Sequence, residues 1–130
     1  MSILKVEQLS TGYGKKEIVR DISMELSLGQ VVSILGPNGC GKSTLIKALC
    51  KGLAFKGNVF IDDINTRELS ERELAKLCSY VPQRSGLSID VSVQDAVLMG
   101  FQPYLGIFGN PSKDMKVRVQ ETLLQVGLGD

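Results

Sequence analysis

Nine residues at positions 36–44, Gly-Pro-Asn-Gly-Cys-Gly-Lys-Ser-Thr, constrain this chain more than any other feature. They fit the pattern G-x-x-x-x-G-K-[ST] and stand between an apolar stretch and a helical one. Glycines let the backbone turn so that successive N–H groups point inward at an anion. The start of a helix adds a partial positive charge. Only about four in a thousand random chains of 130 residues would contain this pattern. The run therefore predicts a phosphate-binding turn.

Such a turn, called a P-loop, predicts binding of a nucleoside triphosphate. Lys42 would bridge the terminal phosphates, and Ser43 would hold Mg²⁺ through its hydroxyl group. The Cys40 side chain is expected to point away from the loop. Because P-loop folds serve many functions, the motif alone does not identify which kind of nucleotide-binding protein this is. The residues expected to contact the nucleotide here are Gly36, Asn38, Gly39, Cys40, Gly41, Lys42, Ser43 and Thr44.

The hydrophobic pattern around the motif predicts two kinds of strand. Residues 3–10 are strand-like, and residues 17–28 alternate as in an antiparallel strand with one wet face. Residues 30–35 are almost continuously apolar, as in a strand covered on both faces. Residues 43–51 have helical spacing, and Gly52 suits the C-terminal cap.

The pattern beyond residue 52 predicts short strands and three more helices. The helix over 69–78 is expected to start near Ser70, and the last helix has Ser112 as its N-cap. The buried stripe of that last helix is expected to comprise Met115, Val119, Leu123 and Val126. The expected elements are strands at 57–64 and 79–82, helices at 69–78, 93–99 and 112–126, and loops at 83–90 and 100–111.

Composition removes several classes of function. Lys and Arg number 15 against 14 Asp and Glu, so the charge of +1 gives no basic excess for nucleic-acid binding. The chain has no His, which excludes imidazole catalysis and the common Cys/His zinc sites. The three cysteines are odd in number and lie 10 and 28 residues apart, so they fit neither a disulfide framework nor a CxxC metal pair and favour a reducing compartment. Cys50 and Cys78 are expected to be inert core residues.

Further motifs give the chain a family resemblance. Together with the P-loop, Tyr13 and the phrase Tyr80-Val81-Pro82-Gln83 resemble the ATP-binding subunits of ABC transporters, and the resemblance spans the chain. It implies that Tyr13 stacks on adenine. It also implies that Gln83 reaches the metal and the attacking water. Lys42 and Gln83 are therefore the expected catalytic residues, Ser43 and Gln83 the expected metal contacts, and ATP and Mg²⁺ the expected cofactors.

The resemblance also implies a fold and a domain organisation. The expected class is α/β: a P-loop NTPase core with a parallel sheet and flanking helices, plus an N-terminal antiparallel β-subdomain. The chain would be the N-terminal part of one ATP-binding domain, ending before the signature motif. Its parts would be antiparallel strands and the P-loop strand (1–35), the P-loop and its helix (36–52), a β/α segment (53–82), and the Gln83 loop with the start of a helical subdomain (83–130).

A subfamily phrase suggests the transport task. Residues 97–100, with 103–106 and Phe108 after them, are similar to importers of iron-siderophore, haem and cobalamin chelates, although Phe101 replaces a common basic residue. The resemblance implies a cytoplasmic ATPase on the inner face of the membrane. It would contact permease subunits through the Gln83 loop and pair with a second ATP-binding subunit. The signature motif, the Asp-Glu strand and the switch histidine are missing, so these residues are expected to bind nucleotide without efficient hydrolysis.

Two alternatives remain open at this point. One is a nucleotide-binding module without a transport role. The other is a small P-loop kinase or GTPase, in which Asp62 would end an apolar strand and position Mg²⁺. Only three apolar residues precede Asp62, and Gly57-Asn58 suggests a hairpin edge, so a turn is preferred at this position.

Overall fold

The computed structural model describes residues 2–83, 90–106 and 109–129. The chain divides into two compact units, Met1–Tyr80 and Val81–Asp130, and each unit is described by itself. The predicted loop at 83–90 lies mostly outside the described residues, as does Phe108.

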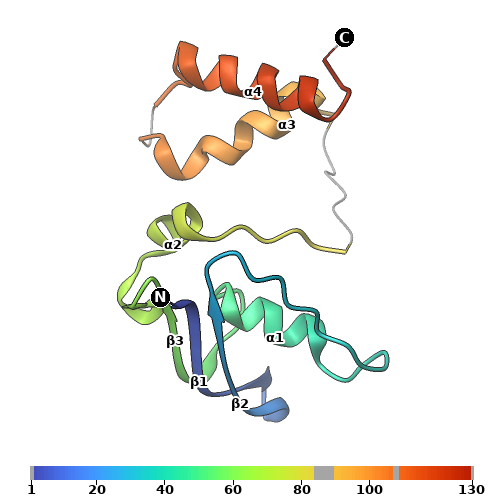
Figure 1. The fold of residues 1–130 in the computed structure, drawn as a ribbon, viewed down its shortest axis with the longest axis vertical. Helices are drawn as coiled ribbons and strands as arrows, with labels where there is room; N and C mark the ends of the chain where they lie inside the picture. The colour runs from blue at the N-terminus through green and yellow to red at the C-terminus, as the bar shows by residue number, and fades with distance from the viewer. Residues whose placement is uncertain (1, 84–89, 107–108, 130) are drawn as a thin grey trace. The chain divides into compact units, whose positions relative to one another are not determined.

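A four-stranded antiparallel sheet runs through the first unit (Figure 1). Its strands lie in the order β2-β1-β3-β4, so β1 pairs on both sides. The predicted N-terminal antiparallel subdomain is therefore confirmed. Along β2 the apolar side chains are less exposed than the polar ones between them, as the alternation predicts. The strands are β1 (Ser2–Tyr13), β2 (Lys16–Ser27), β3 (Phe55–Ile61) and β4 (Ile64–Asn65).

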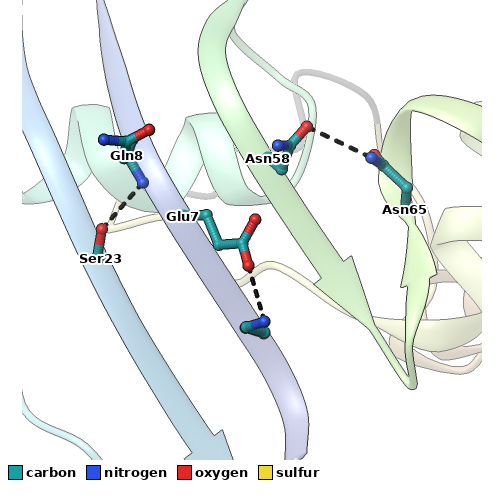
Figure 2. Close-up of polar contacts among 6 residues, drawn as sticks. Glu7, Gln8, Ser23, Asn58 and Asn65 are labelled. Atoms are coloured by element: carbon teal, nitrogen blue, oxygen red, sulfur yellow. Dashed lines mark hydrogen bonds and ion pairs between the residues drawn. The ribbon is translucent and has the colours of Figure 1, made fainter.

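Two residues with left-handed backbone interrupt the pairing of β1 with β2. Gln8 and Asp21 both have φ of 49°. The Gln8 N–H donates to Ser23 Oγ at 3.0 Å (Figure 2), and the Asp21 N–H donates to Ser10 Oγ at 2.9 Å. The two serines thus satisfy donors that the irregular ladder releases.

The core of this unit lies between one face of the sheet and α1 (Lys42–Leu49). In Figure 2, α1 lies behind the strands, while the labelled polar side chains stand in front of them. The helix that follows the P-loop is thereby fixed to the sheet by apolar packing. The buried cluster comprises Val6, Leu9, Val19, Leu45, Ala48, Leu49 and Val59.

The C-terminal end of α1 differs from the prediction. Lys51, not Gly52, has the left-handed backbone, with φ of 56°. Its N–H donates to Ala48 O at 3.0 Å, and the Gly52 N–H donates to Lys47 O at 2.8 Å, which is the Schellman pattern. The Lys51 amine donates to Leu69 O at 2.7 Å. This bond ties the helix end to the segment before the next helix.

The strand predicted at 30–35 is wrong for this structure. Residues 30–37 have no regular secondary structure, and Val31 and Leu35 are 94% and 91% exposed. An extended segment becomes a strand only when a neighbour pairs with its N–H and C=O groups. Among the described residues no strand pairs with this segment, and all described strand pairs are antiparallel. The parallel sheet expected for the core is therefore not formed within the described chain.

A tight turn joins β3 to β4 and corrects the boundaries of the strand predicted at 57–64. Asp62 and Asp63 have φ of 47° and 63°. Positive φ at both central positions is the requirement of a type I′ hairpin turn. The Asp62 side chain is exposed. The preferred interpretation of Asp62 as a turn residue is confirmed.

The helix predicted near Ser70 is confirmed as α2 (Glu71–Leu77), preceded by the short 3₁₀ turn η1 (Thr66–Glu68). Ser70 and Glu73 form a capping box: the Glu73 N–H donates to Ser70 Oγ at 3.2 Å, and the Ser70 N–H donates to Glu73 Oε2 at 2.8 Å. The Ser70 hydroxyl, which donates to Glu73 Oε2 at 2.6 Å, and then the Ser70 N–H lower the pKa of Glu73, because both bonds favour its charged form. The strand predicted at 79–82 is wrong, because this segment has no regular structure.

The second unit consists of helices. They are α3 (Val93–Leu98), the 3₁₀ helix η2 (Met99–Tyr104) and α4 (Lys113–Gln125). Ser112 caps α4 as predicted. On α4 the expected stripe is only partly buried: Val119 and Leu123 are covered, but Val126 is 63% exposed. The loop predicted from residue 100 is wrong over its first part, because η2 continues directly from α3. In the part of the chain that the structure describes, no helix is long and apolar enough to span a membrane.

Candidate phosphate-binding site

The glycine-rich turn leads directly into α1. Gly39 and Gly41 have φ of 83° and 101°, values that side-chain-bearing residues rarely adopt. Gly41 is the N-cap of α1 and has no side chain to satisfy the first N–H groups of the helix. The first turn of α1 contains no acidic residue. Free N–H groups and the positive end of the helix dipole therefore remain for an anion.

Packing against β2 gives a second reason for glycine at position 41. A Cβ atom there would lie 3.0 Å from Cγ2 of both Ile18 and Val19. The start of α1 thus packs directly against β2, the second strand of the β1–β2 hairpin. Backbone conformation and lack of space both select glycine at this point.

Lys42 turns back over the loop. Its amine donates to Gly36 O at 2.7 Å and to Pro37 O at 2.8 Å. These bonds place the positive charge over the turn, next to the uncapped start of α1. The structure therefore brings Gly36 and Lys42, which begin and nearly end the motif, into direct contact.

Cys40 does not point away from the loop as expected. Its Sγ lies 3.9 Å from Lys42 Nζ, and a Cβ atom at Gly36 would lie only 2.7 Å from the same sulfur. The side chain therefore folds back over Gly36. Glycine at position 36 leaves the space that the thiol occupies. Any anion seated on this turn lies near an exposed cysteine.

The two hydroxyl residues after Lys42 have different surroundings. Ser43 is exposed, whereas Thr44 is 7% exposed and packs inward. A hydroxyl oxygen is a ligand that Mg²⁺ accepts, so Ser43 fits a metal at the mouth of the turn. Asn38 is also exposed. Among the described residues, no group of three or more acidic or cysteine side chains is arranged to hold a metal by itself.

Tyr13 lies at the end of β1, where the β1–β2 hairpin turns. Its side chain is 48% exposed, so one part of the ring is open to solvent. The ring borders an open pocket of about 460 Å³ formed by the hairpin and residues 53–56. No residue of the phosphate-binding turn lines that pocket. Tyr13 and the turn are therefore held by the same two strands without sharing a cavity.

Gln83 belongs to the second unit and is exposed. The residues after it, 84–89, lie outside the described residues. Its role with the metal and the attacking water stays a prediction.

Sequence reasoning missed one close pair of chemically active side chains. Cys50 and Cys78 are half-buried, line the same surface pocket and lie close enough to interact. The prediction that both are core residues is wrong as to burial, because each lines a surface pocket. A separation of 28 positions carries no local signal, because only the fold of the first unit brings them together.

A glycine-rich turn opens a helix beside an antiparallel sheet, so the described chain is of mixed α/β class, and the solved structures on which it superposes give it a P-loop NTPase fold. The family model described as "ABC transporter" matches residues 19–130, so the chain belongs to this family of nucleotide-binding proteins.

Relatives with curated names include several ATP-binding proteins of import systems. The hemin import ATP-binding protein HmuV of Bordetella pertussis is 41% identical over 78% of this chain and 39% of its own length. The manganese transport system ATP-binding protein MntB of Halalkalibacterium halodurans is 36% identical over 97% of this chain and 49% of its own length. The iron(3+)-hydroxamate import ATP-binding protein FhuC of Bacillus subtilis is 28% identical over 100% of this chain and 49% of its own length. The chain thus spans less than half the length of each.

A solved structure gives the same result for the fold. A chain of an ABC transporter assigned to the metal-chelate type, in an inward-facing conformation, superposes with a TM-score of 0.75 at 25% identity. The match covers 99% of this chain and 47% of that one.

Proposed function

We propose that this chain is the ATP-gripping part of a transporter ATPase that energises import of a metal chelate, such as an iron-siderophore or haem. The observation that carries the proposal is the Lys42 amine, held over a glycine-rich turn that opens a helix without a side-chain cap. ATP phosphates carry the charge that this arrangement favours. The names of the hemin and hydroxamate relatives support the chelate, and the manganese relative supports a metal cargo more broadly.

Each site residue has a defined task in this proposal. The turn residues hold the phosphates through backbone N–H groups, Lys42 neutralises the terminal phosphates, and Ser43 offers its hydroxyl to Mg²⁺. Bound Mg²⁺ would add charge neutralisation at the phosphate oxygens. Tyr13 stacks on adenine, and Gln83 orients the attacking water. These tasks rest on the family resemblance together with the exposure of Ser43, Tyr13 and Gln83.

The partners in this proposal are a transmembrane permease, contacted through the Gln83 loop, and a second ATP-binding subunit. The chain would work in the cytoplasm at the inner face of the membrane. By themselves these 130 residues would bind nucleotide without efficient turnover, because the sequence lacks a Leu-Ser-Gly-Gly-Gln signature and a histidine. Measurable turnover by these residues would contradict this part of the proposal.

Binding of a fluorescent ATP analogue tests the nucleotide site. Lys42→Ala is expected to weaken binding about 30-fold or more, because a charged hydrogen-bonding partner of phosphate is lost. Lys47→Ala is the matched control, since Lys47 is an exposed lysine of the same helix and is expected to bind normally. Equal affinity of wild type and Lys42→Ala would contradict the proposed site.

Alkylation of Cys40 gives an independent test. The thiol is exposed and adjacent to Lys42, so saturating MgATP is expected to slow its reaction with iodoacetamide at least several-fold. Peptide mapping by mass spectrometry separates Cys40 from the other two cysteines. Identical labelling with and without MgATP would show that nucleotide does not occupy the turn.

Identifying the cargo requires an experiment on the whole transporter. The longer protein that contains this sequence would be purified with its permease and reconstituted in liposomes. ATP turnover is expected to rise with a ferric siderophore or haem and its binding protein. Stimulation by Mn²⁺ alone would replace the chelate with a free metal ion as the cargo.

A further inference from the structure

Two of the three cysteines meet where two helices end. Cys50 is the C-cap residue of α1, and Cys78 is the C-cap residue of α2. Both line one surface pocket of about 370 Å³, and their thiols are close enough to interact electrostatically. The two sulfur atoms are therefore neighbours in the folded chain.

The backbone around the pair is fixed without any help from the thiols. Lys51, which directly follows Cys50, donates from its amine to Leu69 O at 2.7 Å. Leu69 precedes the capping box of α2, and Leu74 anchors that helix with only 3% of its surface exposed. The end of α1 is thus tied to the start of α2, and the shared pocket places the end of α2 beside Cys50, which keeps the effective concentration of one thiol near the other high.

The surroundings assign different parts to the two sulfurs. Burial, followed by the charge of the neighbouring Cys78 thiol, raises the pKa of Cys50 to about 11. Cys50 therefore keeps its proton at neutral pH. It is the poorer attacking sulfur of the pair, so it is placed to react second.

We propose that Cys50 and Cys78 are a redox-active pair that glutathione disulfide converts reversibly into an intramolecular disulfide. The Cys78 thiolate attacks one sulfur of glutathione disulfide, forms a mixed disulfide and expels one glutathione thiolate. Cys50 then loses its proton, attacks the Cys78 sulfur and expels the second glutathione thiolate. Two electrons pass from the protein to the oxidant, and two protons leave the protein thiols and end on the two glutathione molecules.

The bond would link the far end of the P-loop helix to the end of α2, outside the proposed nucleotide site. Both thiols are half-buried beside the pocket that Glu71, Ala75 and Tyr80 also line, so a small oxidant reaches them from solvent. Because the reaction involves no nucleotide, its test is independent of the proposed function.

The test incubates the chain in glutathione redox buffers, quenches with acid, alkylates the remaining thiols and maps peptides without reduction. The number of alkylated cysteines is expected to fall from three to one. A peptide pair linking Cys50 to Cys78 should appear and should disappear again with excess reduced glutathione. Conversion of the mixed disulfide should speed up about tenfold per pH unit below the pKa of Cys50.

Single variants identify the order of attack. Cys50→Ser is expected to stop at a stable mixed disulfide of Cys78 with glutathione. Cys78→Ser is expected to react at least tenfold more slowly at position 50. The reverse pattern would overturn the assignment of the two sulfurs.

Several outcomes would overturn the pair itself. These are mixed disulfides alone in the wild-type chain, disulfide-linked dimers, a disulfide that includes Cys40, or no oxidation in buffers that oxidise a model dithiol peptide. Equal formation of the Cys50–Cys78 bond in guanidinium chloride would show that the fold is not its cause.

Discussion

Strand β1 and the segment 30–35 are both rich in aliphatic side chains, yet only β1 is part of a sheet. Val6 and Leu9 of β1 are 2% and 0% exposed, whereas Val31 and Leu35 are 94% and 91% exposed. β1 has β2 and β3 beside it, and α1 covers the apolar face of the sheet. Burial of an apolar side chain therefore depends on the neighbours that the fold supplies, and the sequence of the segment alone does not determine it.

Replacing the same residue type in the two regions gives the largest expected difference. Leu9→Ala is expected to lower the free energy of unfolding by about 4 kcal/mol, because it opens a cavity under the sheet. Leu35→Ala is expected to change it by less than about 0.5 kcal/mol. Urea denaturation followed by circular dichroism measures both. A large loss in Leu35→Ala would mean that residues 30–35 are packed in solution.

Two glycines with positive φ differ in how crowded an added Cβ atom would be. Their substitution by alanine therefore distinguishes steric crowding from backbone strain. A Cβ atom at Gly57 would lie 2.4 Å from the carbonyl oxygens of Glu7 and Gln8, and φ is 87°. Gly14 has φ of 58° and open space around it. Gly57→Ala is expected to cost about 3 kcal/mol and Gly14→Ala about 1 kcal/mol in the same denaturation experiment. Similar losses at the two sites would show that β3 does not approach β1 as described.

The capping box of α2 is expected to have a smaller and purely local effect. Ser70→Ala removes the acceptor for the Glu73 N–H and should lower the free energy of unfolding by about 1 kcal/mol. Ser70→Asp is the control that restores a capping acceptor. An unchanged urea midpoint in Ser70→Ala would show that the N-cap hydrogen bond does not stabilise α2.

The same box predicts a pH dependence with a definite sign. The pKa of Glu73 is lower in the folded chain, so its charged form stabilises the fold above the unfolded pKa. That contribution is lost as the pH falls through the folded pKa. Wild type is therefore expected to lose more stability than Glu73→Gln between neutral and acidic pH. A steeper loss in Glu73→Gln would contradict this sign.

The β3–β4 turn should give the smallest change, and a gain. Asp63 has φ of 63°, where glycine avoids the strain that a side chain brings. Asp63→Gly is expected to raise the free energy of unfolding by about 0.5 kcal/mol, measured as a shift of the urea midpoint. Asp63→Val should lower it, and a gain in that variant would exclude the turn geometry.

Features with local causes could be predicted from the sequence, and features with distant causes could not. The P-loop, the caps at Ser70 and Ser112 and the β1–β2 pairing follow from spacing within a few residues. The strand at 30–35 failed because its pairing needs a neighbouring strand that the described residues do not provide. The left-handed backbone of Lys51 was not predicted. The hydrogen-bond partner of its amine, Leu69 O, lies 18 residues away and gives no local signal.

The hydrogen bonds from Lys42 to Gly36 O and Pro37 O have a consequence for ligand exchange. The ammonium has three N–H donors and these carbonyl groups use two of them, so a phosphate competes with the carbonyl groups for the amine. The gain in binding is then the difference between two sets of hydrogen bonds, which is smaller than the full strength of an ammonium–phosphate contact. When the phosphate leaves, the same carbonyl groups can take the amine back. The loop thus acts as an internal competitor of its ligand, lowering affinity while favouring rapid turnover of the site.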